Sequence, residues 1–222
     1  MRMPFGAPGG NAPRKGHECR KSCLSADFEC HVCRHPWHAV TDLNRSPGMT
    51  ADDVCRFLDL MQDLGIHVWL DGGWAVDACL GSQTRHHADL DIALEKRDLA
   101  AVVDALRGRG YTDVPRDDTQ PWNFVLGDQA GHEVDFHVIE VAEDGRGIYG
   151  PAERGEFYPA AALTGTGTVN DRTVDCISPE WLVKFHTGYQ LDATDRADVS
   201  ALCERFGIAL PNEYREAQRP SK

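Results

Sequence analysis

The stretch TRHHADLDIAL, residues 84–94, constrains the fold more than any other part of the chain. Its apolar residues alternate as in a strand that buries one face: Ala88, Leu90, Ile92 and Leu94. Asp89 and Asp91 take the alternate positions, so their carboxylates point to the opposite face. Carboxylates held this close repel one another unless a cation neutralises them. The pattern therefore predicts either a metal site or a solvated face of a strand.

A third carboxylate lies on a later predicted strand. Asp135 stands in EVDFHVIEV, flanked by Val134 and Phe136 in the same alternation. If the two strands are neighbours in one sheet, three carboxylates converge, and oxygen ligands with open positions suit Mg²⁺. We therefore predict a magnesium site made by Asp89, Asp91 and Asp135. His137, two residues further on, is a candidate for orienting one of these carboxylates.

A glycine pair precedes the carboxylates. Gly72 and Gly73 stand in DGGWAVD, between a short strand in IHVWL and a helix. Glycines let backbone amides approach a ligand, and a helix N-terminus favours an anion. The same pair also serves as a plain strand-to-helix turn. Arg85 has the planar guanidinium that suits phosphate oxygens, or is a surface arginine. Lys184, on a C-terminal helix, either reaches a pyrophosphate or faces solvent.

The order of predicted elements indicates the fold class. Thr50 and Asp53 form a capping box for a first helix, which Gly65 ends. The elements then follow as strand, helix, strand, helix, a hairpin around residues 128–131, an irregular stretch over 143–173, a helix capped by Ser178 and a last helix over 195–206. This order predicts an α+β fold, with a small mixed sheet backed by helices and a helical C-terminal part.

The first 48 residues differ in composition from the rest. They are rich in Pro, Gly, Cys and His and carry seven basic and four acidic side chains, whereas the remainder carries sixteen and thirty-one. We divide the chain into a leader (1–48), a domain (49–210) and a tail (211–222). The leader is read as flexible, as sequence upstream of a start at Met49, or as a zinc knuckle. The knuckle's ligands would be Cys19, Cys23, Cys30 and Cys33.

The formal net charge of −12 limits the partners. An acidic body repels a nucleic-acid backbone and suits metal cations or a cationic small molecule. Neither a secretory signal nor an apolar run long enough for a membrane span is apparent, so we expect a cytoplasmic protein. The four cysteines outside the leader are expected to be reduced. A homodimer is compatible with the sequence.

In combination these motifs resemble the polymerase-β-type nucleotidyltransferase superfamily: a glycine pair and Trp after a strand, then Arg-x-His-x-Asp-x-Asp, then a lone Asp on a later strand. Within it, VWLDGGWAVD and DCISPEWLVKFHTGYQLDATDRAD look most like the lincosamide nucleotidyltransferases. The aminoglycoside 2″-adenylyltransferases come next. The resemblance covers roughly residues 50–208.

The resemblance implies a nucleotidyltransferase fold and a set of residue roles. Asp89, Asp91 and Asp135 would bind two Mg²⁺ ions, with Asp135 as metal ligand, base for the acceptor hydroxyl, or both. Gly72 and Gly73 would cradle the triphosphate of ATP, assisted by Arg85. AMP would then pass to a hydroxyl of an antibiotic, a lincosamide first, and pyrophosphate would leave.

Several alternatives remain open at this point. The acceptor could equally be an aminoglycoside or a protein side chain, and the irregular stretch 143–173, which we expect to set acceptor specificity, matches no pattern. A different class of function is a zinc-dependent nucleic-acid-binding module with a nucleotide-sensing body. Among aromatic candidates, Trp74 either stacks on a base or packs in the core. His186 and Tyr189 are assigned to the core or to a substrate wall.

Overall fold

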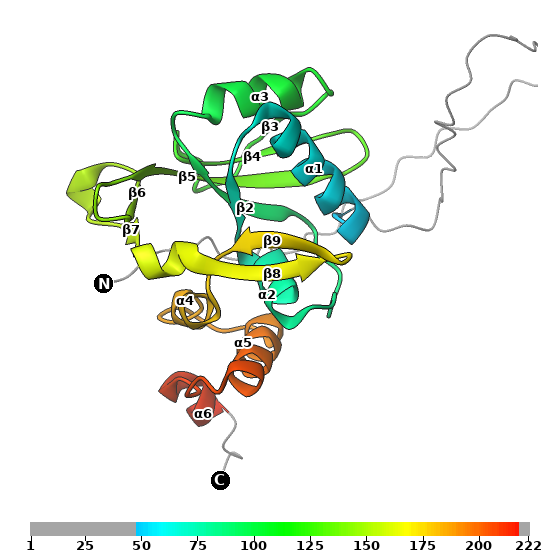
Figure 1. The fold of residues 1–222 in the computed structure, drawn as a ribbon. Coiled ribbons are helices and arrows are strands. Elements are labelled where there is room, and N and C mark those ends of the chain that lie inside the picture. The colour runs from blue at the N-terminus through cyan, green and yellow to red at the C-terminus, as the bar shows by residue number, and fades with distance from the viewer. Residues whose placement is uncertain (1–47, 218–222) are drawn as a thin grey trace, which may run out of the picture. The chain divides into compact units, whose positions relative to one another are not determined.

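A computed structural model of the chain describes residues 48–217 (Figure 1). Residues 1–47 of the leader, with the zinc-knuckle candidates Cys19, Cys23, Cys30 and Cys33, lie outside these described residues, as do residues 218–222. The predictions made for the leader therefore stay predictions. The four cysteines within the described part have free thiols, as expected: Cys55, Cys79, Cys176 and Cys203.

One mixed sheet organises the described residues. Its strands are β1 (Val68–Leu70), β2 (Leu90–Glu95), β3 (Thr112–Val114), β4 (Asn123–Gly127), β5 (Glu133–Val141), β6 (Gly147–Tyr149), β7 (Phe157–Tyr158), β8 (Gly165–Val169) and β9 (Arg172–Cys176). The main path runs β3-β4-β5-β2-β1-β9-β8, and β6 joins β7 to β5. The pairs β2–β5 and β1–β9 are parallel, whereas β1–β2 and β4–β5 are antiparallel. The predicted mixed sheet is confirmed.

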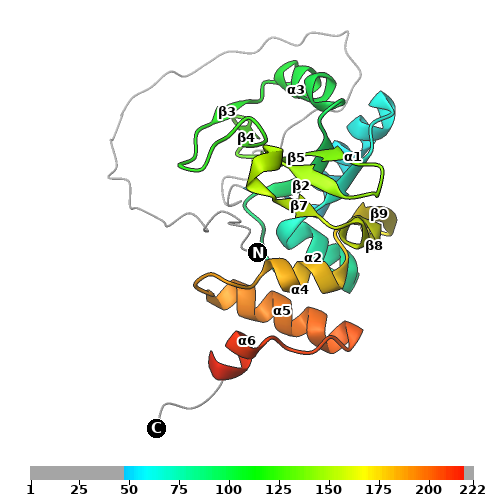
Figure 2. The same ribbon diagram turned by 90° about the vertical axis from the view of Figure 1, so that its left-hand side faces the viewer.

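The helices form two groups around this sheet. Helices α1 (Ala51–Leu64) and α3 (Leu99–Arg107) contact each other, while α2 (Gly72–Leu80), α4 (Pro179–Phe185) and α5 (Ala193–Phe206) form a second contacting set. Figure 2 shows α2, α4, α5 and α6 (Asn212–Ala217) stacked one beyond another, away from α3. Each helix of the described part is too short or too polar to span a lipid bilayer.

Local sequence signals explain most helix ends. Thr50 and Asp53 make the expected capping box, and Gly65 ends α1 in the left-handed conformation at φ 67°. Asp192 and Asp195 make a second capping box at the start of α5, which Gly207 ends. Pro179 occupies the first turn of α4, although the Ser178 side chain makes no capping hydrogen bond. Helix α1 then buries its apolar residues in the hydrophobic core.

The expectation of an irregular stretch over 143–173 was wrong. Residues 143–173 contain β6, β7, β8, the start of β9 and two short 3₁₀ helices, η1 (Ala152–Arg154) and η2 (Ala160–Thr164). Strands β8 and β9 form a hairpin whose turn residues Asn170 and Asp171 both have positive φ. These two residue types tolerate that conformation, so the turn signal was present. The sequence GTGTV of β8 did not predict a strand, because glycine and threonine do not give an alternation of apolar and polar residues.

Helix α6 lies within the segment 211–222, which the sequence analysis treats as a tail. Its Tyr214 is buried, and the Tyr214 hydroxyl donates to the carbonyl oxygen of His186, just after α4. The Tyr214 side chain thus helps to join this helix to the helical C-terminal part.

Candidate active site

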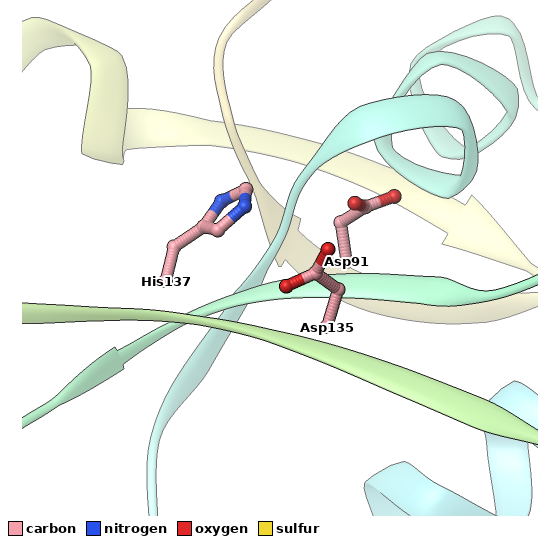
Figure 3. Close-up of side chains that lie close together, drawn as sticks. All are labelled: Asp91, Asp135 and His137. Atoms are coloured by element: carbon pink, nitrogen blue, oxygen red, sulfur yellow. The ribbon is translucent and has the colours of Figure 1, made fainter. Parts of the chain in front are cut away.

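Two of the three predicted carboxylates meet on neighbouring strands. Asp91 of β2 lies opposite Asp135 of β5 in the parallel register, so both side chains leave the same face of the sheet. One ligand atom from each of Asp91, Asp135 and His137 lies within 4.8 Å of the others. Figure 3 shows the two carboxylates side by side, with the His137 ring on the same side of β5. Parallel pairing of β2 and β5 is what brings the distant motifs together.

Asp89 lies at the margin of this pair. It precedes β2, which begins at Leu90, and its side chain is partly exposed. Asp89 does not belong to the three-residue group of ligand atoms, yet its charge acts on both other carboxyls. The predicted alternation holds for Leu90, Ile92 and Leu94, but Ala88 is exposed and lies before the strand, as Asp89 does.

The electrostatics of the pair favour a cation. Burial, with the charges of Asp89 and Asp135, raises the pKa of Asp91 well above its ordinary value. Burial also raises the pKa of Asp135 to about 6, although nearby His137 opposes the shift. Asp135 Oδ1 is buried and has no hydrogen-bond partner among residues 48–217. A buried carboxylate oxygen that lacks a donor fits a metal ligand, so these residues fit a magnesium ion.

The glycine pair lies directly against the carboxylates. Gly72 opens α2 at φ 52°, and a Cβ atom there would overlap the carboxylate of Asp91. A Cβ atom on Gly73 would overlap the Arg85 guanidinium and the His87 ring. Both positions therefore require glycine, since any side chain would displace a group of the site. The start of α2 thus borders the Asp91 carboxylate.

A buried polar network lies on the same side of the sheet. Asp71, the N-cap of α2, accepts a hydrogen bond from the Gly72 amide at 2.8 Å. Its other carboxylate oxygen accepts from the Tyr158 hydroxyl at 2.7 Å and from His137 Nδ1 at 3.1 Å. Burial alone would raise the pKa of Asp71, but its hydrogen bonds, that of His137 foremost, hold it below the ordinary value. Burial disfavours the His137 cation, yet the Asp71 hydrogen bond and three carboxylates raise its pKa to about 9.

The predicted phosphate-binding cations have other partners in this structure. The Arg85 guanidinium, which is one-third exposed, makes an ion pair at 3.0 Å with Asp198, a buried residue of α5. Lys184 is exposed on α4, and its ammonium lies 3.9 Å from the centre of the Trp181 ring. Arg85 borders Gly73, whereas no contact joins Lys184 to the carboxylates among the described residues.

The remaining aromatic and histidine candidates have structural contacts. Trp74 is 1% exposed and packs 4.6 Å from the buried His87 ring, so it belongs to the core. His87 pairs with Asp77 of α2, while His86 is exposed. The Tyr189 hydroxyl donates to Asp195 at 2.9 Å, and His186 Nδ1 lies 2.8 Å from the Leu182 carbonyl oxygen.

Four buried residues near the site were not singled out from the sequence. They are Asp71, Asp77, Tyr158 and Asp198. Asp71 carried a signal, because Asp before a glycine-opened helix is a common N-cap. Tyr158 carried none, since it belongs to the stretch read as irregular.

The chain matches an established family over most of its length. The family model of aminoglycoside-2″-adenylyltransferases matches residues 53–202. A lincosamide resistance protein of Staphylococcus haemolyticus is 30% identical over 158 residues, which are 71% of this chain and 97% of that protein. A 2″-aminoglycoside nucleotidyltransferase of Escherichia coli is 40% identical over 59 residues, one-third of its length.

Solved structures agree with the sequence comparison. The lincosamide antibiotic adenylyltransferase LnuA, crystallised with lincomycin bound, superimposes with a TM-score of 0.62 at 30% identity, covering 73% of this chain and 99% of that one. The structure of ANT(2″)-Ia with adenylyl-2″-tobramycin gives a TM-score of 0.57 at 18% identity and shares the fold, covering 76% and 98% of the two chains. The expected α+β nucleotidyltransferase fold is confirmed. The chain belongs to the aminoglycoside-2″-adenylyltransferase family and is a nucleotidyltransferase.

Proposed function

We propose that this nucleotidyltransferase transfers AMP from ATP to a hydroxyl of a cationic antibiotic, a lincosamide by preference. The observation that carries the proposal is the half-buried Asp91–Asp135 pair beside the glycine turn. The choice of acceptor rests on the similarity to a lincosamide resistance protein, which extends over 97% of that protein. Both antibiotic classes are cationic sugars, which suits a chain with a net charge of −12.

In this proposal Asp89, Asp91 and Asp135 would hold two Mg²⁺ ions. Bound there, the ions would stabilise the attacking and leaving oxygens of an in-line displacement. The amides at Gly72 and Gly73 would receive the triphosphate, because helix starts favour anions. Arg85 borders this turn, and Lys184 would assist only if its side chain leaves Trp181.

The chain's own groups would carry the proton. The acceptor oxygen attacks the α-phosphorus of ATP. The bond between the α-phosphorus and the oxygen that bridges it to the β-phosphorus breaks, and pyrophosphate leaves. The hydroxyl proton passes to Asp135, whose pKa of about 6 suits a base near neutral pH. Because ATP is the donor, the reaction belongs in the cytoplasm.

An aminoglycoside acceptor is the second candidate, since the matching family model is named for that activity. No described contact favours a protein side chain. The nucleic-acid module is not supported for the body, whose relatives are named as nucleotidyltransferases and resistance proteins.

A panel assay separates these acceptors. The full-length protein is incubated with ATP labelled in the α-phosphate, Mg²⁺ and individual lincosamides or aminoglycosides, and labelled adducts are identified by mass. We expect AMP adducts of lincosamides at a higher kcat/KM than those of aminoglycosides, and none with Asp135→Asn. Adducts of aminoglycosides alone would reassign the acceptor. The absence of adducts with either class would refute the proposal.

A further inference from the structure

Three buried groups connect the glycine turn to the carboxylate strand. Asp71, His137 and Tyr158 are 4%, 7% and 0% exposed. The Tyr158 hydroxyl lies 2.7 Å from Asp71 Oδ2 and 2.9 Å from His137 Nδ1, and His137 Nδ1 lies 3.1 Å from the same Asp71 oxygen. We call this triangle the Asp71 network. It comes from three separate parts of the chain: the end of β1, the middle of β5 and strand β7.

Two corners of the Asp71 network, Asp71 and His137, lie next to parts of the candidate active site. Asp71 Oδ1 accepts from the Gly72 amide, and the Asp71 amide donates to the Asp91 carbonyl oxygen at 2.9 Å. His137 follows Asp135 by two residues and leaves the same face of β5. Asp71 therefore has its two carboxylate oxygens assigned to different tasks. One fixes the glycine turn, and the other faces His137 and Tyr158.

Tyr158 closes the triangle from outside the catalytic motifs. Strand β7 reaches this place through β6, which pairs with β5, and Gly147 of β6 lies opposite Tyr158. The ring of Tyr158 packs edge-on against Phe185 of α4 at 5.4 Å. Its ring position is thus set by packing, and its hydroxyl reaches a buried carboxylate. A hydrogen bond to a charged, buried acceptor is among the stronger ones in a protein.

We propose that Tyr158 is a positioning residue for nucleotidyl transfer, acting through Asp71 on the Gly72 turn and on the His137 ring. Removal of its hydroxyl would let the Asp71 carboxylate rotate, since one of the donors to Oδ2 is lost. The Gly72 amide and the backbone around Asp91 would then lose a fixed geometry. Small displacements at such a site cost rate more than they cost substrate affinity. This inference rests on the proposed function, because transfer is one of its readouts.

The chain offers a matched control for Tyr158→Phe. Tyr149 is also buried, at 7% exposed, and also lies edge-on to a neighbouring ring, that of His137. Its hydroxyl donates to Asn123 at 2.6 Å and not to the Asp71 network. Tyr149→Phe thus removes one buried hydroxyl from the same region, without touching Asp71.

The first experiment compares the two variants in the full-length protein by steady-state kinetics. For Tyr158→Phe we expect kcat to fall about tenfold or more, with the acceptor KM within about twofold of wild type, as for loss of one charge-assisted hydrogen bond. For Tyr149→Phe we expect kcat within about threefold of wild type. Equal losses in both variants, or an unchanged kcat for Tyr158→Phe, would overturn the inference.

A second measurement does not depend on turnover. Hydrogen–deuterium exchange of the peptide spanning residues 68–76 reports on the Gly72 amide. We expect faster exchange there in Tyr158→Phe than in wild type or Tyr149→Phe, measured below the unfolding temperature of each protein. Unchanged exchange in this peptide would refute the positioning role. If wild type transfers AMP to no acceptor, the proposed function fails, while this measurement still decides the role of Tyr158 in fixing the turn.

Discussion

At the scale of single residues, the opening pattern of two carboxylates on a strand is explained by its neighbour in space. Asp91 and Asp135 lie opposite each other on parallel strands, and no donor within the described part of the chain reaches one buried oxygen of Asp135. Such a pair costs stability when both groups are ionised, and it is retained where a cation is to be bound. In the proposed function, these two carboxylates would bind a cation at a cost to the stability of the fold.

Replacing one carboxylate should separate activity from stability. We expect Asp91→Asn to lower kcat on the order of a thousandfold, because charge neutralisation in the transition state is lost. Without Mg²⁺, the variant should unfold at the same or a higher temperature than wild type, since burial and like charges disfavour the Asp91 anion. Calorimetry at pH 8 measures this difference. The exposed Asp117→Asn serves as the control, and a large loss of stability in Asp91→Asn contradicts the account.

The raised pKa of Asp135 gives a pH dependence with a definite sign. A carboxyl whose folded pKa is about 6 favours folding below its unfolded pKa and loses that contribution as pH rises through 6. Mg²⁺ requires the ionised form, so its affinity should increase over the same interval. We expect the stabilisation by added Mg²⁺ to grow between pH 5 and pH 7, measured as a shift of the unfolding temperature. Asp135→Asn should abolish this trend, and a pH-independent shift in wild type would argue against the assignment.

At the scale of elements, the turn between β1 and α2 does more than connect them. Gly72 lets the first turn of α2 touch the Asp91 carboxylate, while Asp71 caps the helix and hydrogen-bonds within the Asp71 network. These contacts fix the positions of β1, the start of α2 and β2 relative to one another. The geometry of this turn depends on the Asp71 carboxylate as well as on the backbone hydrogen bond from the Asp71 amide to the Asp91 carbonyl oxygen.

Two glycines with similar backbone angles allow a matched test of the turn. Gly65 (φ 67°) and Gly72 (φ 52°) are both left-handed, but a Cβ atom meets nothing within 4 Å at Gly65 and overlaps Asp91 at Gly72. We expect Gly65→Ala to cost roughly 1 kcal/mol of stability and no activity. Gly72→Ala should lower kcat about a hundredfold or more, because it displaces a catalytic carboxylate. Kinetics and chemical denaturation check both, and equal kcat values for the two variants would contradict the proposed contact.

At the scale of the whole molecule, sequence reasoning recovered what periodicity and motif spacing encode. The first helix, the hairpin of β4 and β5 and the convergence of Asp91 with Asp135 follow from alternation, caps and a family resemblance. The partners of Arg85 and Asp71 did not follow, because Asp198 and Tyr158 lie far away in the chain. Long-range polar pairs leave no local pattern. Short strands rich in glycine and threonine, such as β8, leave a weak one.

The leader provides the last test, since the family model begins only at residue 53. Met49 is 2% exposed, and its amide donates to the His87 carbonyl oxygen at 3.0 Å, so this end of the body belongs to the fold. A cut directly before Met49 would place a charged amine at a buried hydrogen bond, which is costly. We therefore expect removal of residues 1–44 to leave kcat and the unfolding temperature unchanged, whereas removal of residues 1–48 should lower the unfolding temperature. Parallel kinetics and calorimetry of the two truncations check this. Loss of turnover on removal of residues 1–44 would show that the leader contributes to the active fold, because that deletion leaves the contact of Met49 with His87 in place.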